Sequence, residues 1–333
     1  MRPIFRSADS GGSMLFGLVR SSMRWWGVLL CIAQFGIADL CAAVAATPAA
    51  RALWVWEDDT FQLLDREDQW DETFSFLAHQ NITTVYLYAD RSRKRNIIRD
   101  EPGKYRRLIA ALHGRGFKVY ALLGSIYLNT QEYILPWRRA TATAMFKNVL
   151  RYNAGSVELE RFDGVNVDIE PYLLDDWSTK RTLRAIQYLD LAAEFMRLKR
   201  QSGDALAVGP AMPFWFDGID NITWRGKRQR LSDHAQDIYD YVAIMDYRNF
   251  AQGSDGMISH ALDELEYADR TGKAVVIGVE TLDTEPRKVT FYGMGQDAME
   301  QQLGIAAAEF SAHPSFAGFA IHHLAPYRDM VDS

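Results

Sequence analysis

The sequence predicts a single (β/α)8 barrel that follows an N-terminal export signal. Short apolar runs alternate with longer amphipathic segments from residue 53 onward, which indicates parallel strands joined by helices. Eight such units occupy about 280 residues, the usual size of this barrel. No linker rich in Pro, Gly or Ser divides them, and 48% hydrophobic and 24% charged residues are ordinary for a globular chain.

Residues 1–46 have the composition of a secretory signal peptide. Four arginines between positions 2 and 24 precede an apolar run over 25–38, and small residues with an Ala-Val-Ala tripeptide follow at 42–46. We expect cleavage after Ala45 or Ala46, a mature domain of residues 47–333, and a secreted or periplasmic protein without stable membrane insertion. The alternative is an uncleaved anchor, because residues 25–46 are long enough to span a bilayer.

Charge and cysteine content exclude two classes of function. With 37 basic and 43 acidic residues the net charge is -6, which provides no basic surface for a phosphate backbone, so we expect no nucleic acid partner. Only Cys31 and Cys41 are present, and both lie in the N-terminal segment. A fold stabilised by several disulfides is therefore excluded.

Eight near-continuous apolar runs, rich in Val, Ile, Leu and aromatic residues, predict strands that are buried on both faces. They occupy residues 53–56, 84–88, 118–123, 164–170, 206–212, 241–245, 274–279 and 316–321.

Six amphipathic segments between these runs predict helices, with apolar residues at every third or fourth position. They occupy residues 71–80, 105–115, 141–152, 179–201, 259–270 and 296–312. Glycines follow several of them, as at Gly203 and Gly272, where a helix ends before the next strand. No Gly-rich phosphate-binding motif follows the first strand, which argues against a dinucleotide-binding fold.

The carboxyl ends of the strands, where active sites of such barrels lie, carry many polar residues. The candidates at these ends are Glu57, Asp58, Asp90, Ser125, Tyr127, Asp168, Glu170, Asp246, Tyr247, Glu280, His322 and His323. We expect no metal and no cofactor, because the adjacent His322 and His323 would point to opposite faces of a strand.

The segment 162–170, Phe-Asp-Gly-Val-Asn-Val-Asp-Ile-Glu, is the most informative part of the sequence. Side chains alternate along a strand, so Asn166, Asp168 and Glu170 share the face that points into the barrel. Repulsion between two neighbouring carboxylates raises the pKa of one of them, which pairs a protonated acid with an ionised partner, as glycosidic cleavage requires. The alternative is a polar layer whose hydrogen bonds are satisfied inside the barrel.

This segment resembles the strand-four signature of family 18 glycoside hydrolases, the chitinases and endo-β-N-acetylglucosaminidases, with Asn166 at a position that is most often Asp. Residues 245–247, Met-Asp-Tyr, resemble a second motif of that family. The resemblance implies that Glu170 is the general acid/base and Asp168 its partner, that Asp163 is a supporting carboxylate, and that Tyr247 hydrogen-bonds the acetamido group. The acetamido oxygen of the substrate would then be the nucleophile.

Two positions depart from the family pattern. Arg248 stands where the family usually has Asp, and Ala-Ile-His-His at 320–323 stands where a Trp usually forms the floor of the −1 sugar site. A second mechanism uses Glu280 as the nucleophile of a retaining glycosidase together with Glu170, at a carboxyl separation of roughly 5 Å. Glu280 could equally bind sugar hydroxyls, and a third hypothesis is a carbohydrate-binding barrel without catalysis.

Aromatic and polar side chains near strand ends complete the expected sugar site. Pyranose rings stack on Trp and Tyr, and carboxylates and amides bind their hydroxyl groups. The expected substrate-binding residues are Asp163, Asn166, Glu57, Tyr127, Tyr172, Trp215, Asp246, Arg248 and His322. The sequence thus predicts an exported glycoside hydrolase whose partner is a carbohydrate, and it leaves the sugar, the linkage and the oligomeric state open.

Overall fold

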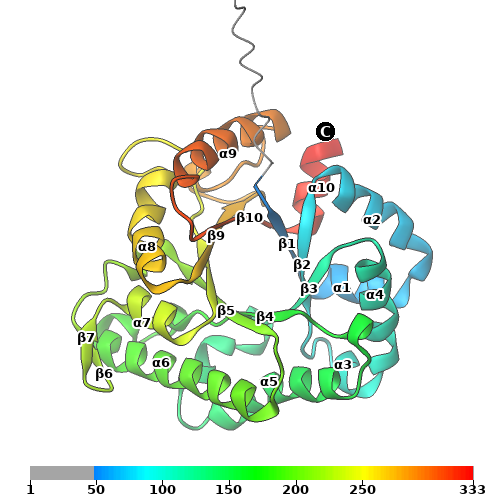
Figure 1. The fold of residues 1–333 in the computed structure, drawn as a ribbon, viewed down its shortest axis with the longest axis horizontal. Coiled ribbons are helices and arrows are strands. Elements are labelled where there is room, and N and C mark those ends of the chain that lie inside the picture. Colours follow the sequence, from blue (N-terminus) through cyan, green and yellow to red (C-terminus); the bar gives the residue numbers. More distant parts are fainter. Residues whose placement is uncertain (1–48, 333) are drawn as a thin grey trace, which may run out of the picture. The chain divides into compact units, whose positions relative to one another are not determined.

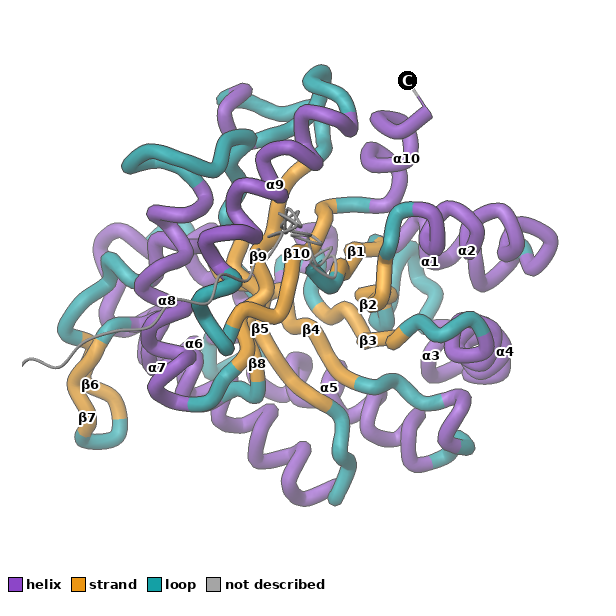
Figure 2. Tube along the Cα trace, turned by 45° about the horizontal axis from the view of Figure 1, so that its top comes forward, coloured by secondary structure: helices purple, strands orange, loops and turns teal. Residues whose placement is uncertain are grey.

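A computed structural model describes residues 49–332 and confirms the (β/α)8 barrel (Figure 1). Eight parallel strands close in the order β1-β10-β9-β8-β5-β4-β3-β2, and the helices form a ring around them (Figure 2). The predicted signal peptide lies outside the described residues. Within residues 49–332, no helix is sufficiently long and apolar to cross a membrane.

Each of the eight predicted apolar runs corresponds to a barrel strand. The strands are β1 (Arg51–Val55), β2 (Ile82–Tyr88), β3 (Lys118–Leu123), β4 (Gly164–Asp168), β5 (Ala207–Pro213), β8 (Tyr241–Met245), β9 (Ala274–Glu280) and β10 (Phe316–His322).

The six predicted helices are also present. They are α2 (Trp70–His79), α4 (Pro102–Gly114), α5 (Arg139–Ala154), α6 (Trp177–Ser202), α8 (Met257–Thr271) and α9 (Gln296–Phe310). The sequence patterns did not predict α1 (Glu57–Asp65), α3 (Ile97–Asp100), α7 (Leu231–Ile238), α10 (Leu324–Asp332) or the hairpin of β6 (Ile222–Trp224) and β7 (Lys227–Gln229). Helix α1 was missed because no side chain caps its start; three acidic residues in its first turn favour the helix dipole instead.

A layer of aromatic side chains fills the barrel interior. The ring centroids of Trp54 and Tyr86 lie 5.3 Å apart, and Tyr86 to Tyr120 and Tyr120 to Tyr241 are each 5.8 Å. Asn166 is buried within this layer: it accepts a hydrogen bond from the Trp54 indole at 3.0 Å and donates one to the Tyr241 hydroxyl at 3.3 Å. Asn166 therefore belongs to the internally satisfied polar layer.

Glycines on neighbouring strands provide the space for these rings. A Cβ atom on Gly164 would lie 2.5 Å from Cε2 of Tyr120, and one on Gly209 would lie 2.6 Å from the Tyr241 ring. Both distances are far below van der Waals contact, so a side chain at either position would displace a ring or the backbone. The aromatic layer thus requires a glycine on the strand adjacent to each of these two rings.

We expect Gly164→Ala to destabilise the protein by about 1–3 kcal/mol, because the added methyl group overlaps the Tyr120 ring. The matched control is Gly304→Ala in α9, where a Cβ meets nothing within 4 Å; we expect it to stabilise by about 0.5–1 kcal/mol. Urea unfolding of both variants measures the difference. Equal stabilities for the two variants would contradict the packing described for the barrel interior.

Candidate active site

A cavity of about 820 Å³ opens at the carboxyl ends of the strands, within the size range of small-molecule sites. Each of the eight barrel strands, or the loop that follows it, contributes to its walls. Nine of the polar candidates at the strand ends line it, namely Glu57, Asp58, Ser125, Tyr127, Asp168, Glu170, Tyr247, His322 and His323.

Two carboxyl groups at the end of β4 are the chemically distinctive feature of this cavity. Burial, and then the charges of Glu170 and Glu57, raise the pKa of Asp168 well above its usual value. Burial raises the pKa of Glu170 to about 7. Oδ1 of Asp168 is buried without a hydrogen-bond partner in residues 49–332, and Oε1 of Glu170 accepts a hydrogen bond from the Tyr172 hydroxyl. The pair therefore keeps a proton up to nearly neutral pH.

The loop after β3 passes closely against this pair because of one glycine. Gly124 has φ +126°, and a Cβ atom there would lie 1.8 Å from the carbonyl oxygen of Asp168, so only glycine fits. The chain then continues into Ser125, whose hydroxyl donates to Oε1 of Glu57 and accepts from the backbone N–H of Tyr127 at 3.2 Å. This places Tyr127, which is 82% exposed, at the rim of the cavity.

A chain of hydrogen bonds fixes the opposite wall. The Trp56 indole donates to Nε2 of His322 at 2.8 Å, so His322 carries its proton on Nδ1 and donates it to Oε2 of Glu280, also at 2.8 Å. Oε1 of Glu280 accepts the backbone N–H groups of Thr281 and Leu282, each at 2.8 Å. Both oxygens of Glu280 are therefore engaged, and Glu280 is not among the residues that line the cavity.

The expectation that His322 and His323 face opposite sides was wrong. Both line the cavity, with ring centroids 4.8 Å apart, and the peptide bond between them is cis. The alternation of side chains applies only within a strand, and β10 ends at His322. Within residues 49–332, no group of three or more His, Cys, Asp or Glu side chains is arranged to hold a metal ion.

The structure corrects the expectation of substrate contact for Asp163 and Asn166, since neither lines the cavity. Asp163 precedes the amino end of β4, opposite the cavity, where its carboxylate accepts from Nε2 of His113 at 2.9 Å and from the backbone N–H of Val119 at 2.7 Å. Asn166 lies within the aromatic layer. A strand's alternation indicates the face of a side chain but not its depth in the barrel.

Asp246 and Arg248 also lie outside the cavity lining. Asp246, the first residue after β8, is buried against α8 and bonds Nδ1 of His260 at 2.8 Å. Arg248 forms an ion pair with Asp255 at 2.6 Å, and its guanidinium lies 5.1 Å from the Phe214 ring centroid. These side chains stabilise the loop after β8 instead of facing a ligand.

Tyr172 and Trp215 lie behind the carboxyl pair and not in the cavity wall. The Tyr172 hydroxyl bonds Glu170, and the Trp215 ring meets Tyr172 edge to face at 5.1 Å between centroids. We infer that they orient Glu170.

Several residues of the wall were absent from the predicted set. They are chiefly Trp54, Asp59, Arg91 and Arg93. Except for Trp54, which lies within a predicted strand, they follow a predicted strand closely, and this position was the available indication. The basic run that contains Arg91 and Arg93 is typical of a solvated loop, and in the structure Arg93 pairs with Asp58 at 2.8 Å.

No protein-family model matches the sequence, and no curated protein matches it either. The structure is similar to solved barrels at 10–14% identity, which shows the fold alone. An exo-β-1,4-mannosidase from Opitutaceae bacterium strain TAV5 matches at 14% identity and TM-score 0.53, over 84% of this chain and 54% of that chain. The PgaB (BpsB) glycoside hydrolase domain of Bordetella bronchiseptica matches at 13% identity and TM-score 0.50, over 86% of this chain and 97% of that chain.

A GH18 chitinase from Cycas revoluta, solved in complex with (GlcNAc)3, matches at 10% identity and TM-score 0.50, over 84% of this chain and 96% of that chain. The chain spans 64% of the length of the Group II chitinase catalytic domain 2 of Ostrinia furnacalis, at a TM-score of 0.42. The fold of the family 18 resemblance is therefore confirmed, and the substrate is not determined by it.

The raised pKa of Glu170 predicts a specific dependence of stability on pH. Its value is about 7 when folded and 4.5 when unperturbed, so the folded state holds a proton that the unfolded state has lost between about pH 4.5 and 7. The contribution of this group to the free energy of unfolding is present below pH 4.5 and is lost as pH rises toward 7. We expect the wild type to lose stability relative to Glu170→Gln across this interval.

Urea unfolding at half-unit steps from pH 4 to 8 measures this difference. Glu309→Gln, which removes an exposed carboxylate on α9, serves as the control and should follow the wild type at every pH. A difference in the free energy of unfolding between wild type and Glu170→Gln that does not change with pH would show that Glu170 titrates in the ordinary range.

Proposed function

We propose that this protein is a glycoside hydrolase that cleaves a polysaccharide or oligosaccharide, with Glu170 as the general acid/base and Asp168 as its partner. One observation carries the proposal: a carboxyl group whose pKa burial raises to about 7 lines a large cavity next to a second buried carboxyl. Such a group is protonated at the pH where it must donate to the leaving oxygen, and it can later accept a proton from water.

The fold agrees with this proposal but does not select the sugar. The matched barrels include proteins described as a chitinase and as a mannosidase, so one architecture accommodates different substrates. The proposed export signal at residues 1–46 makes an envelope or extracellular polysaccharide the expected substrate. Exposed Tyr127 and the indole of Trp56 provide apolar surfaces for pyranose rings.

Substrate assistance is the mechanism that the contacts support best. Glu280 uses both oxygens to hold His322 and the following loop, which leaves it poorly placed to attack an anomeric carbon. Asp168 and Tyr247 line the cavity with Glu170, and Oδ1 of Asp168 has no partner within the described chain. We propose that these two groups orient an acetamido group whose oxygen attacks the anomeric carbon, while Glu170 protonates the leaving oxygen.

Loss of the acid should nearly abolish cleavage. We expect Glu170→Gln to reduce turnover at least about 10²-fold, the size of a general-acid contribution. The measurement is reducing-end release by the full-length protein from chitin oligosaccharides, their de-N-acetylated counterparts, peptidoglycan fragments and mannan oligosaccharides. Cleavage restricted to N-acetylated substrates supports the acetamido nucleophile.

Glu309→Gln is the matched control for this assay and should retain full activity. Thermal unfolding of each variant shows whether a loss of activity reflects a loss of folded protein. If no substrate is cut and a glycan binds equally to wild type and Glu170→Gln, the protein is a carbohydrate-binding barrel and the proposal fails.

A second variant separates substrate assistance from a protein nucleophile. We expect Glu280→Gln to lose about tenfold or less, because the amide oxygen can still accept the Thr281 and Leu282 N–H groups. We also expect that azide does not restore turnover to Glu280→Ala. Azide rescue with formation of a glycosyl azide would identify Glu280 as the nucleophile and overturn the acetamido mechanism.

A further inference from the structure

The connection from β8 to α8, residues 246–256, contributes Tyr247 to the cavity wall, while the residues on either side of it face elsewhere. Tyr247 lines the cavity, and Asp246 and Arg248 do not. Burial, and then the charges of Glu280 and of the carboxyl pair on β4, raise the pKa of Tyr247 well above its usual value. Its hydroxyl therefore keeps its proton and can donate a hydrogen bond to a ligand. Where that hydroxyl points depends on the backbone around residue 247.

Both sequence neighbours of Tyr247 are held by one carboxylate, that of Asp255. The Nη2 and Nε atoms of Arg248 donate to Oδ1 of Asp255 at 2.6 and 3.0 Å, and Nη1 of Arg248 donates to the carbonyl oxygen of Tyr247 at 2.7 Å. On the other side, Nδ1 of His260 bonds Oδ1 of Asp246 at 2.8 Å, and Nε2 of His260 lies 3.3 Å from Oδ1 of Asp255. The backbone at Tyr247 is thus fastened from both directions.

Further contacts hold the same groups in place. The His260 ring stacks on the Phe214 ring, with centroids 3.9 Å apart and planes inclined by 3°, and the Arg248 guanidinium lies 5.1 Å from the Phe214 centroid. Nζ of Lys288, which follows β9, donates to Oδ2 of Asp255 at 2.7 Å. Hydrogen bonds from Arg248 and Lys288 hold the pKa of Asp255 well below its usual range, so this carboxylate stays charged.

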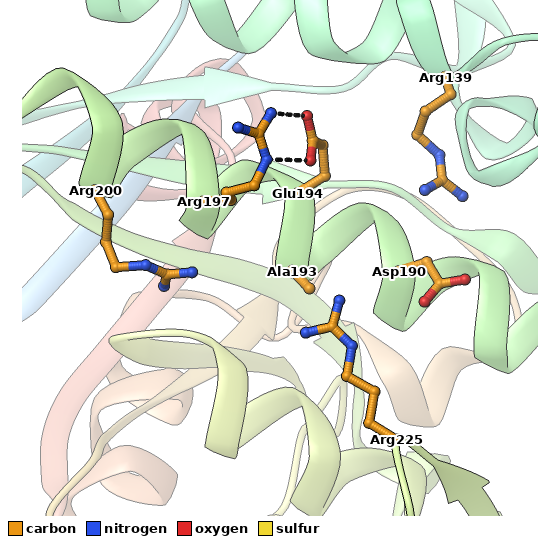
Figure 3. Close-up of a pocket in the computed structure, with 7 residues that line it drawn as sticks. All are labelled: Arg139, Asp190, Ala193, Glu194, Arg197, Arg200 and Arg225. Carbon is orange, nitrogen blue, oxygen red and sulfur yellow. Dashed lines mark hydrogen bonds and ion pairs between the residues drawn. The ribbon is translucent and has the colours of Figure 1, made fainter.

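The ion pair of Glu194 with Arg197 shows a simpler arrangement (Figure 3). Both residues lie on α6, three positions apart, beside a cavity of about 380 Å³ that other arginines also line. Such a pair joins two side chains of one helix and contributes little to stability. Asp255 differs because its three cationic partners come from the loop after β8, from α8 and from the connection after β9.

We propose that Asp255 is a positioning residue of the active site, which fixes the backbone of Tyr247 so that its hydroxyl meets the acetamido group of the substrate. The proposal rests on the proposed glycoside hydrolase function and deepens it. It also gives a role to Arg248, which stands where family 18 usually has Asp: the guanidinium joins Asp255 to the carbonyl group of Tyr247.

A double-mutant cycle with N-acetylated chitin oligosaccharides and the full-length protein tests the role in turnover. We expect Asp255→Ala to reduce turnover at least about tenfold, because small displacements of a substrate-positioning group are costly. Asp255→Asn should recover most of this loss, since its amide oxygen still accepts from Arg248. In Tyr247→Phe, which already lacks the hydroxyl, adding Asp255→Ala should cost less than about twofold more.

The matched control is Asp263→Ala on α8. Asp263 pairs with Arg230 at 2.6 Å, the distance between Asp255 and Arg248, and its side chain is 48% exposed against 44% for Asp255. We expect this variant to keep full turnover. Losses that multiply in the double variant, or an equal loss in Asp263→Ala, would overturn the proposal.

Crystal structures of Asp255→Ala and Asp263→Ala test the positioning without relying on activity. We expect the Tyr247 ring to be displaced or disordered in the first variant and unmoved in the second. A Tyr247 ring that keeps its place in Asp255→Ala overturns the proposal. If the ring is displaced although the wild type cleaves no N-acetylated substrate, Asp255 still positions Tyr247, and the acetamido mechanism of the proposed function is what fails.

Discussion

The limited volume inside the closed barrel is the constraint on which the site depends. Four aromatic side chains fill the interior, and glycines on β4 and β5 leave room for them. This layer closes the cavity from below, and Trp54 is part of both. Carboxyl groups at the end of β4 therefore lie in a part of the barrel that is largely buried. Their desolvation is the largest cause of the raised pKa values of Asp168 and Glu170.

Carboxyl groups around the cavity differ in role because their surroundings differ. Glu280 accepts three hydrogen bonds, two of them from backbone N–H groups, and so holds His322 and a loop in place. Asp168 has a buried oxygen without any donor in the described chain, and Glu170 accepts one hydroxyl. The side chains with few partners are the ones that face the cavity. Unsatisfied polar groups at such a position are expected where a ligand completes the contacts.

The sequence predicted the strands well and the site only in part. Strands buried on both faces are read from uninterrupted apolar runs, and their alternation correctly directed Asp168 inward. Glu170 also lines the cavity, although β4 ends at Asp168. Alternation carries no information on depth, which is why Asp163 and Asn166 were misplaced. It also ends with the strand, which is why His322 and His323 were wrongly expected to face opposite sides.

The departure from the family 18 pattern at the end of β10 has a structural counterpart at β1. Residues 320–323 stand where that family usually has a Trp, and Nε2 of His322 accepts the indole N–H of Trp56. Trp54 and Trp56, from β1 and its end, both line the cavity, and each ring lies 5.9 Å from the His322 ring. The cavity thus keeps indole surfaces, supplied by the neighbouring strand and held by a histidine that Glu280 orients. Because β1 and β10 pair directly, the loss of a side chain on one strand can be offset by a side chain on the other.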